Sequence, residues 1–255
     1  MTGTEADASF RLAYVPGVTP GKWVKTWQER VPQVPLDLVA VTAAQAADLL
    51  REGAADAGLV RLPIDRTDLS VIPLYTEASV VVVPKDHEVA AVEELAVAEL
   101  AEYLVLHPLD DQLEWETLPG QAAKERPQTT ADAIELVAAG VGLLVVPQSL
   151  ARLHHRKDLT YRTLTDAPQS QVGLSWPQEQ TTERVEDFIG IVRGRTANSS
   201  RGRTAPETAA KAPQKAQQKG QQKSQQKGRP QTQQKAQSKT SAKRQDGRGK
   251  PRRSR

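Results

Sequence analysis

The chain has 255 residues, of which 38% are hydrophobic, and a formal net charge of +3. It contains no cysteine, which excludes disulfide frameworks, iron–sulfur clusters, thiolate zinc sites and cysteine nucleophiles. The charge is unevenly divided, because residues 196–255 carry 17 of the 34 lysines and arginines but only two of the 31 acids. An acidic body therefore precedes a basic tail, a pattern that points to a polyanionic partner for the tail.

Nothing in the sequence indicates export or a membrane span. Residues 1–9 carry acids and lack the apolar stretch of a secretory signal peptide. The longest apolar runs, such as Val80–Val83 and Val141–Val146, are far shorter than the ~20 residues that cross a bilayer. We therefore expect a cytoplasmic protein with no membrane partner.

The body alternates short β-rich runs with amphipathic runs, the pattern of an α/β protein with parallel strands. Pro20 suits a first helical position, and Gly53 and Gly140 are good helix terminators. In chain order the pattern predicts a strand over Phe10–Val15, a helix over Pro20–Val31, a strand over Leu36–Val41, a helix over Ala43–Glu52, strands over Ala57–Val60, Leu69–Leu74 and Ser79–Val83, a helix over Val97–Glu102, a strand over Tyr103–His107, a helix over Ala131–Ala139, strands over Leu143–Val146, Leu159–Leu164 and Val172–Trp176, and a closing helix over Glu183–Arg193.

Threonines stand just before three of the predicted helices, beyond the carboxyl ends of predicted strands. They are Thr19, Thr42, which forms a capping box with Gln45, and the pair Thr129 and Thr130. Ligands of open α/β sheets bind at this edge, and the free N–H groups of helix N-termini favour an anion. The sequence therefore predicts a small, anionic ligand there. The alternative is that each threonine is only an N-cap, worth about 1 kcal/mol.

From Thr196 onward the chain contains no Trp, Tyr, Phe, Leu, Ile, Val or Met, so we predict a disordered tail. Its lysines recur with a four-residue spacing that favours sequence-independent contact with DNA or RNA through counterion release. The alternatives are a solubilising tail, or one that folds back on the acidic body. The lysines of the repeat are Lys211, Lys215, Lys219, Lys223, Lys227, Lys235, Lys239 and Lys243.

Six stretches of the body have a distinctive order and spacing. They are FRLAYVPGVTPGKWVKTWQERVPQVPLDLVAV, AADLLREGAADAGLVRLP, LSVIPLYTEASVVVVPKDHEVA, AVAELAEYLVLHP, TTADAIELVAAGVGLLVVPQSLARL and YRTLTDAPQSQVGLSWP. Together they resemble the effector-binding domain of LysR-type transcriptional regulators, over about Phe10 to Gly194.

The resemblance implies the fold of type 2 periplasmic binding proteins. This is an α/β fold in which two Rossmann-like subdomains are joined by two crossover strands, with a small effector in the cleft between them. The first subdomain would comprise residues 10–82 and 165–193 and the second residues 83–164, with a disordered tail over 196–255. No cofactor is implied. The positions matching the cleft turns of the family are Gly17, Val18, Thr19, Thr42, Arg61, His107, Thr129 and Thr130.

Two of these positions have a second interpretation. Arg61 would either pair with an anionic effector or lie in a surface ion pair. His107 would either hydrogen-bond a ligand or play a structural role at a strand end. Likewise, Asp110 and Asp111, with Glu114 and Glu116, could mark a cation site, but a solvated acidic face is the favoured interpretation.

The sequence departs from a LysR-type regulator at its beginning. Only residues 1–9 precede the first predicted strand, whereas the family begins with a winged helix-turn-helix and a linker helix. Operator binding in the manner of the family is therefore not expected. The chain has no G-x-S-x-G, H-E-x-x-H or Walker A motif, and we expect neither an enzyme nor a metal site.

These observations predict a stand-alone regulatory protein that binds a small effector in its cleft and contacts nucleic acid through its tail. One alternative is a protein–protein interaction module that associates with itself or with a complete LysR-type regulator. Another is a nucleic-acid-binding protein driven by its tail, with a vestigial cleft.

Overall fold

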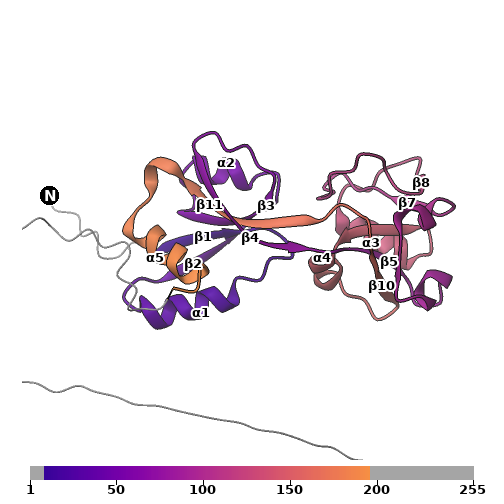
Figure 1. Ribbon diagram of the computed structural model, residues 1–255, viewed down its shortest axis with the longest axis horizontal. Coiled ribbons are helices and arrows are strands. Elements are labelled where there is room, and N and C mark those ends of the chain that lie inside the picture. The colour runs from indigo at the N-terminus through magenta and orange to yellow at the C-terminus, as the bar shows by residue number, and fades with distance from the viewer. Residues whose placement is uncertain (1–8, 196–255) are drawn as a thin grey trace, which may run out of the picture. The chain divides into compact units, whose positions relative to one another are not determined.

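The computed structural model describes residues 9–195, which form two α/β subdomains, each built on one sheet (Figure 1). The first sheet has the strand order β2-β1-β3-β11-β4 and the second the order β6-β10-β5-β9-β7-β8. The strands are β1 Phe10–Tyr14, β2 Leu36–Ala40, β3 Ala57–Leu62, β4 Leu69–Glu77, β5 Ser79–Pro84, β6 Glu94–Leu95, β7 Leu104–Leu106, β8 Gln121–Ala122, β9 Leu143–Pro147, β10 Leu159–Leu164 and β11 Ser170–Pro177. The helices are α1 Gly21–Arg30, α2 Ala46–Arg51, α3 Thr130–Ala138, α4 Gln148–Leu153 and α5 Glu183–Val192, with 3₁₀ segments over Glu88–Ala91, Val97–Leu100 and Gln178–Gln180.

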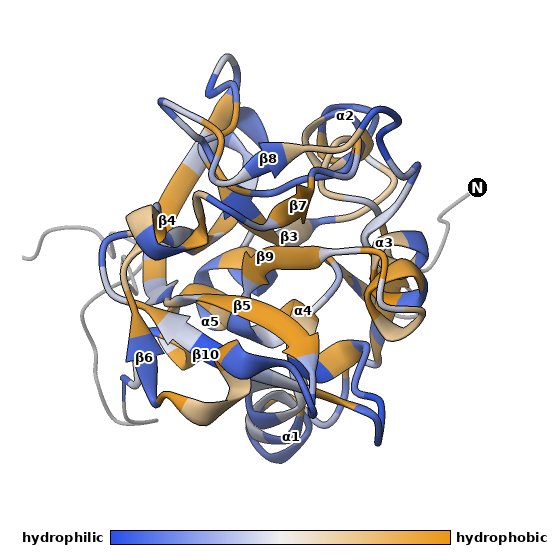
Figure 2. Ribbon diagram, turned by 90° about the vertical axis from the view of Figure 1, so that its right-hand side faces the viewer, coloured by the Kyte–Doolittle hydropathy of each residue, from blue (hydrophilic) through white to orange (hydrophobic). Residues whose placement is uncertain are grey.

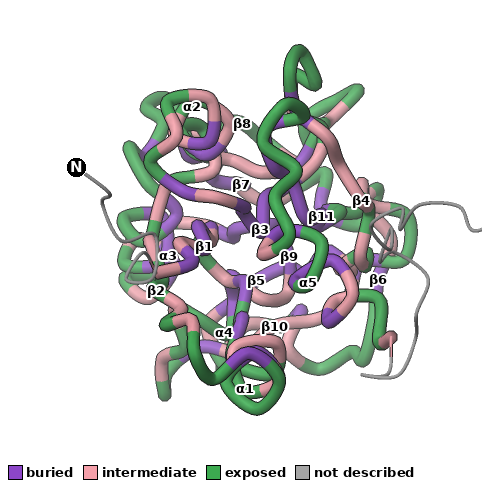
Figure 3. Tube along the Cα trace, turned by 90° about the vertical axis from the view of Figure 1, so that its left-hand side faces the viewer, coloured by how far each residue is buried: buried purple, intermediate pink, exposed green. Residues whose placement is uncertain are grey.

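In the first sheet, β1 pairs in parallel with β2 and β3, while β11 runs antiparallel to β3 and β4. An aromatic cluster joins this sheet to α1 and α5: Phe10 stacks on Trp27 with ring centroids 4.7 Å apart, and Phe188 lies 5.3 Å from Phe10. All three side chains are fully buried, and such ring pairs add about 0.5–1.5 kcal/mol each to area burial. This cluster fixes the two helices on the sheet. Figure 3 shows that β3 is mostly buried, whereas α1 is largely exposed.

The second sheet is buried on both faces. Its central strands β5 and β9 are apolar and pair antiparallel (Figure 2). Because successive side chains of a strand point to opposite faces, Val80 and Val82 pack with Ile134 of α3, while Val81 and Val83 pack with Leu100 on the other side. This explains why these strands are unbroken apolar runs rather than alternating ones.

Two chain segments connect the subdomains. After β4 the chain passes through Ala78 into β5, and after β10 it returns through residues 165–169 into β11. The Ser79 hydroxyl donates a hydrogen bond to the Pro168 carbonyl oxygen, so the two segments are bound to each other. The expected boundary at residue 82 therefore lies too late in the chain, because residues 79–82 pair in the second sheet. Thr76 and Glu77 still pair with β11 in the first sheet, so the chain passes from one sheet to the other at Ala78.

Two predicted helices are shorter than expected. The helix predicted from Ala43 begins at Ala46, because Thr42–Gln45 form a hydrogen-bonded turn before it. The segment predicted over Val97–Glu102 is a 3₁₀ turn over Val97–Leu100. Among residues 9–195, no helix is long and apolar enough to cross a membrane. The predicted tail and its eight lysines lie outside the described residues.

Candidate functional site

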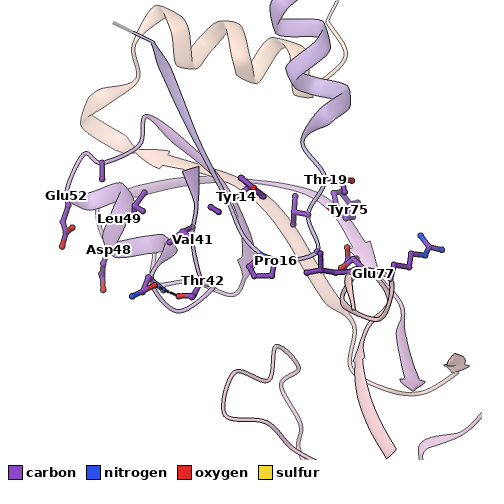
Figure 4. A pocket seen from close by; sticks show the side chains of 18 residues that line it. Tyr14, Pro16, Thr19, Val41, Thr42, Asp48, Leu49, Glu52, Tyr75 and Glu77 are labelled. Carbon is purple, nitrogen blue, oxygen red and sulfur yellow. Dashed lines mark hydrogen bonds between the residues drawn. The ribbon is translucent and has the colours of Figure 1, made fainter. Parts of the chain in front are cut away.

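Two cavities open beside the carboxyl ends of the first-sheet strands. The larger has a volume of about 1250 Å³ and includes Gly17, Val18, Thr19 and Thr42 in its lining, together with Tyr14, Asp48 and Glu77 (Figure 4). Ser149 and Arg152 of α4 complete it from the second subdomain. Four of the eight predicted cleft residues therefore meet in one cavity.

The second cavity, of about 650 Å³, lies between the subdomains. The first subdomain contributes Thr42 and Arg61, and the second contributes Thr129 and Thr130. Pro16, Thr42 and Leu153 line both cavities. Seven of the eight predicted residues thus line one cavity or the other, and His107 lines neither.

Arg61 is buried and forms a network that joins both subdomains. Its Nη1 donates to Glu77 Oε2 at 3.0 Å and to Ser170 Oγ at 2.7 Å. Its Nη2 donates to the Pro16 carbonyl oxygen at 3.2 Å and to Ser149 Oγ at 2.9 Å. The side chains of Arg61 and Glu77 are only 4% and 10% exposed, so the ion pair is buried. Neither interpretation of Arg61 from sequence foresaw this, because Ser149 lies 88 residues away and on the other subdomain.

Gly17 allows this network to form. It has a φ of +85°, a conformation that side-chain-bearing residues rarely adopt, and a Cβ there would lie 2.5 Å from Ser149 Oγ and 2.9 Å from Arg61 Nη2. The turn after β1 can therefore approach α4 only because residue 17 has no side chain.

Thr129 caps helix α3, and Thr130 is the first residue of that helix. Thr129 Oγ1 accepts from the Asp132 N–H at 3.1 Å, and the Asp132 carboxylate accepts from the Thr129 N–H. The Thr130 hydroxyl donates to Asp110 Oδ1 at 2.9 Å. Both threonines thus line the second cavity, but both side chains already have partners within the protein.

Sequence reasoning missed the acidic loop that lines the second cavity. Asp110, Asp111 and Glu114 all contribute to its wall, although a solvated acidic face was the favoured interpretation. Asp111 accepts hydrogen bonds from the Leu113 N–H at 3.0 Å and from Trp115 Nε1 at 3.2 Å, and burial raises its pKa above the usual value. The loop follows β7, whose parallel partner is β9, so the rule applied to the threonines could have found it.

His107 has a structural place behind this loop. It is buried, and its Nε2 lies 3.3 Å from the Pro119 carbonyl oxygen, which can only accept a hydrogen bond. Nε2 therefore carries the proton. Arg126 holds the same stretch by donating to the carbonyl oxygens of His107 and Pro108, both at 2.7 Å. Burial lowers the pKa of His107, so the neutral imidazole is favoured.

The second cavity combines an apolar wall with carboxylates. Apolar side chains of Leu62, Ile64, Leu109, Leu113 and Leu150 line the second cavity beside its carboxylates. Within residues 9–195, no group of three or more His, Cys, Asp or Glu side chains could hold a metal ion.

Two mixed sheets joined by two segments, with a cavity lined from both, define a two-subdomain α/β fold of the type 2 periplasmic-binding-protein class. The BenM effector binding domain with its effector benzoate superposes with a TM-score of 0.63 at 18% identity, over 74% of this chain and 92% of that one. The oxidized form of OxyR superposes with a TM-score of 0.61 at 20% identity, over 74% and 96%. At these identities the likeness shows the fold.

Residues 5–197 match the LysR substrate binding domain, and the chain belongs to that family, as the sequence stretches predicted. HcaR, the Hca operon transcriptional activator of Escherichia coli K12, is 22% identical over 207 residues, which are 76% of this chain and 70% of HcaR. A probable hydrogen peroxide-inducible genes activator of Mycobacterium leprae is 28% identical over 154 residues, which are 56% of this chain and 50% of that protein. These relatives are transcriptional activators by name.

Proposed function

We propose that this chain is a cytoplasmic, non-enzymatic regulatory protein whose body binds a small ligand in the cavity between its subdomains. The observation that carries the proposal is the 650 Å³ cavity lined from both sheets in a domain of this family. A cavity of this size suits a small organic ligand. Within it, Thr42, Thr129 and Thr130 are the proposed contacts from the predicted set.

The physical mechanism is a population shift between open and closed arrangements of the subdomains. A ligand that touches both walls binds the closed arrangement more tightly, and it shifts the equilibrium by that difference in affinity. Arg61, Glu77 and Ser149 lie at the junction that such a movement would rearrange. We therefore assign these residues to the coupling between the subdomains rather than to ligand contact.

A metabolite screen on the full chain, read by thermal shift, tests the binding. A ligand at 100 times its dissociation constant should stabilise the fold by about 2.7 kcal/mol. The variant Ala44→Trp places a large ring in the exposed wall of the second cavity and should abolish the shift. Ala98→Trp, at an exposed site outside both cavities, is the matched control. A screen without a hit, or a hit that Ala44→Trp leaves unchanged, would refute the proposal.

The sequence-based expectation of an anionic ligand finds little support in the lining. It rested on Arg61 and on the helix N-termini, but Arg61 is bound to Glu77, and Asp110 holds the Thr130 hydroxyl. The side chains expected to attract an anion are therefore already neutralised or occupied within the protein.

We also propose that residues 196–255 form a separate basic segment that contacts nucleic acid without base specificity. The support is the lysine repeat and the concentration of positive charge there. Replacing the eight repeat lysines by glutamine in the full chain should weaken DNA and RNA binding. The dependence of log affinity on log salt should also become less steep, by about 0.9 for each phosphate of duplex DNA that is no longer neutralised. Unchanged affinity and slope would contradict this role.

The second candidate function is a protein–protein module that pairs with itself or with a complete LysR-type regulator. The family match favours it, and sizing of the full chain across a concentration series tests it. A monomer at all concentrations that recovers no regulator in pull-down would remove this candidate.

A further inference from the structure

We propose that the ligand of the cavity between the subdomains is a small organic cation, an amine with an apolar body. This inference rests on the proposed function and concerns the same cavity. The proposed ligand has the opposite charge to the anion that the sequence suggested. The proposal follows from which charged and hydrogen-bonding groups of the cavity wall remain available to a ligand.

The charge in the cavity wall is mainly negative. Asp110, Asp111 and Glu114 supply three carboxylates on one loop. The cationic side chain in the same lining, Arg61, is paired with Glu77 at 3.0 Å, and His154 is the one other basic residue lining the cavity. An anion entering this space would meet more negative than positive charge in a partly desolvated site, where like charges repel strongly.

The side-chain donors that the sequence suggested for an anion, those of Arg61, Thr129 and Thr130, are already engaged. The guanidinium of Arg61 uses both Nη1 and Nη2 on four protein oxygens. The hydroxyl of Thr130 is directed to Asp110, and that of Thr129 to Asp132 at 2.8 Å. The groups expected to receive a carboxylate are thus satisfied by carboxylates and other oxygens of the protein itself.

The carboxylates of the cavity wall, in contrast, still offer hydrogen-bond acceptors to a ligand. An ionised carboxylate offers about four lone-pair positions, and the hydrogen bonds from Leu113 and Trp115 fall one on each oxygen of Asp111. A ligand ammonium supplies three donors and a positive charge. It would also relieve the cost of burying Asp111, whose pKa burial raises.

The remaining wall of the cavity is apolar. Leu109 and Leu113 flank the carboxylates, and Leu62, Ile64 and Leu150 complete the apolar lining. An inorganic cation would leave this apolar surface unused, and the described residues hold no metal-binding group. An amine that carries a ring or a branched chain would fill both parts of the cavity.

The test uses sets of three compounds that share one apolar body and differ in one group. Benzylamine, benzyl alcohol and benzoate form one set, and the cyclohexylmethyl and indolylmethyl equivalents form two more. Each is titrated into the full chain at neutral pH, and the ¹H–¹⁵N signals are followed. The indole N–H of Trp115, which donates to Asp111, reports binding at the wall.

In at least one set the amine should bind about tenfold or more tightly than the carboxylate, and should shift the Trp115 indole signal. Asp110→Asn and Asp111→Asn should each reduce amine affinity about fivefold and leave the alcohol unchanged. Glu116→Gln, on the same loop but outside the lining, should change nothing.

Three results would overturn the inference in distinguishable ways. Carboxylates that bind as tightly as the amines would refute the charge class and leave the proposed ligand-binding function standing. Absence of binding by all nine compounds, in a chain that also gives no hit in the metabolite screen, would refute both. If the screen yields ligands that Ala44→Trp blocks but those ligands are anions, only the charge class fails.

Discussion

The buried pair of Arg61 and Glu77 gives the sharpest stability prediction. Glu77 Oε2 accepts from Arg61 Nη1 at 3.0 Å and from Ser149 Oγ at 2.8 Å. Glu77→Ala removes both bonds and leaves a guanidinium, 4% exposed, without its counter-charge. Breaking a buried pair in this way costs about 3–5 kcal/mol, which is a large fraction of the roughly 5–15 kcal/mol that stabilises a typical domain.

The assay is urea unfolding of the full chain, followed by tryptophan fluorescence. Glu135→Ala is the matched control, because Glu135 pairs with Arg156 but is 69% exposed, and exposed pairs contribute about 0–1 kcal/mol. Replacing both partners with apolar side chains, as in Arg61→Met with Glu77→Leu, should restore most of the loss. A loss of less than about 1 kcal/mol in Glu77→Ala would show that the pair is not isolated from water, and would refute the reasoning.

Three further predictions concern single positions. Gly17→Ala should destabilise the fold by about 1–3 kcal/mol, and by more than Gly53→Ala. Both glycines have a positive φ, but only a Cβ at position 17 would collide with other side chains. Equal losses of unfolding free energy in urea would contradict the close approach. Thr129→Ala should cost about 1 kcal/mol through loss of the α3 cap, while Thr129→Ser should keep it, as measured by the same unfolding curves. His107 has a lowered pKa because of burial, so its contribution to stability is complete above the usual value of 6.5 and is lost as the pH falls through the folded pKa. Between pH 7.5 and 5.5 the melting temperature of the wild type should therefore fall further than that of His107→Gln. Equal falls in the two proteins would exclude a contribution from His107 protonation.

Most strands and helices were predictable because their signals are local, whereas the two-subdomain fold was implied by the resemblance to LysR-type regulators. The strand over Leu159–Leu164, for example, was predicted with its observed bounds. The break between β4 and β5 was predicted, because separate strands were expected over Leu69–Leu74 and Ser79–Val83. The sequence pattern does not reveal which sheet a strand joins, so it could not show that residues 79–82 pair with β9.

The site was predictable only where strand ends define it. Thr42, Thr129 and Thr130 follow that rule and line the cavity. The partners of Arg61 could not be found in this way, because the network depends on Ser149 and Ser170, 88 and 109 residues away along the chain. Asp111 was expected to be solvated because the sequence does not reveal that Leu113 and Trp115 fold around it.

The bond between Ser79 and Pro168 has a mechanical consequence. Because a hydrogen bond joins the two connecting segments, we expect them to move together rather than independently. We therefore expect subdomain movements that keep this bond to be less costly than movements that break it.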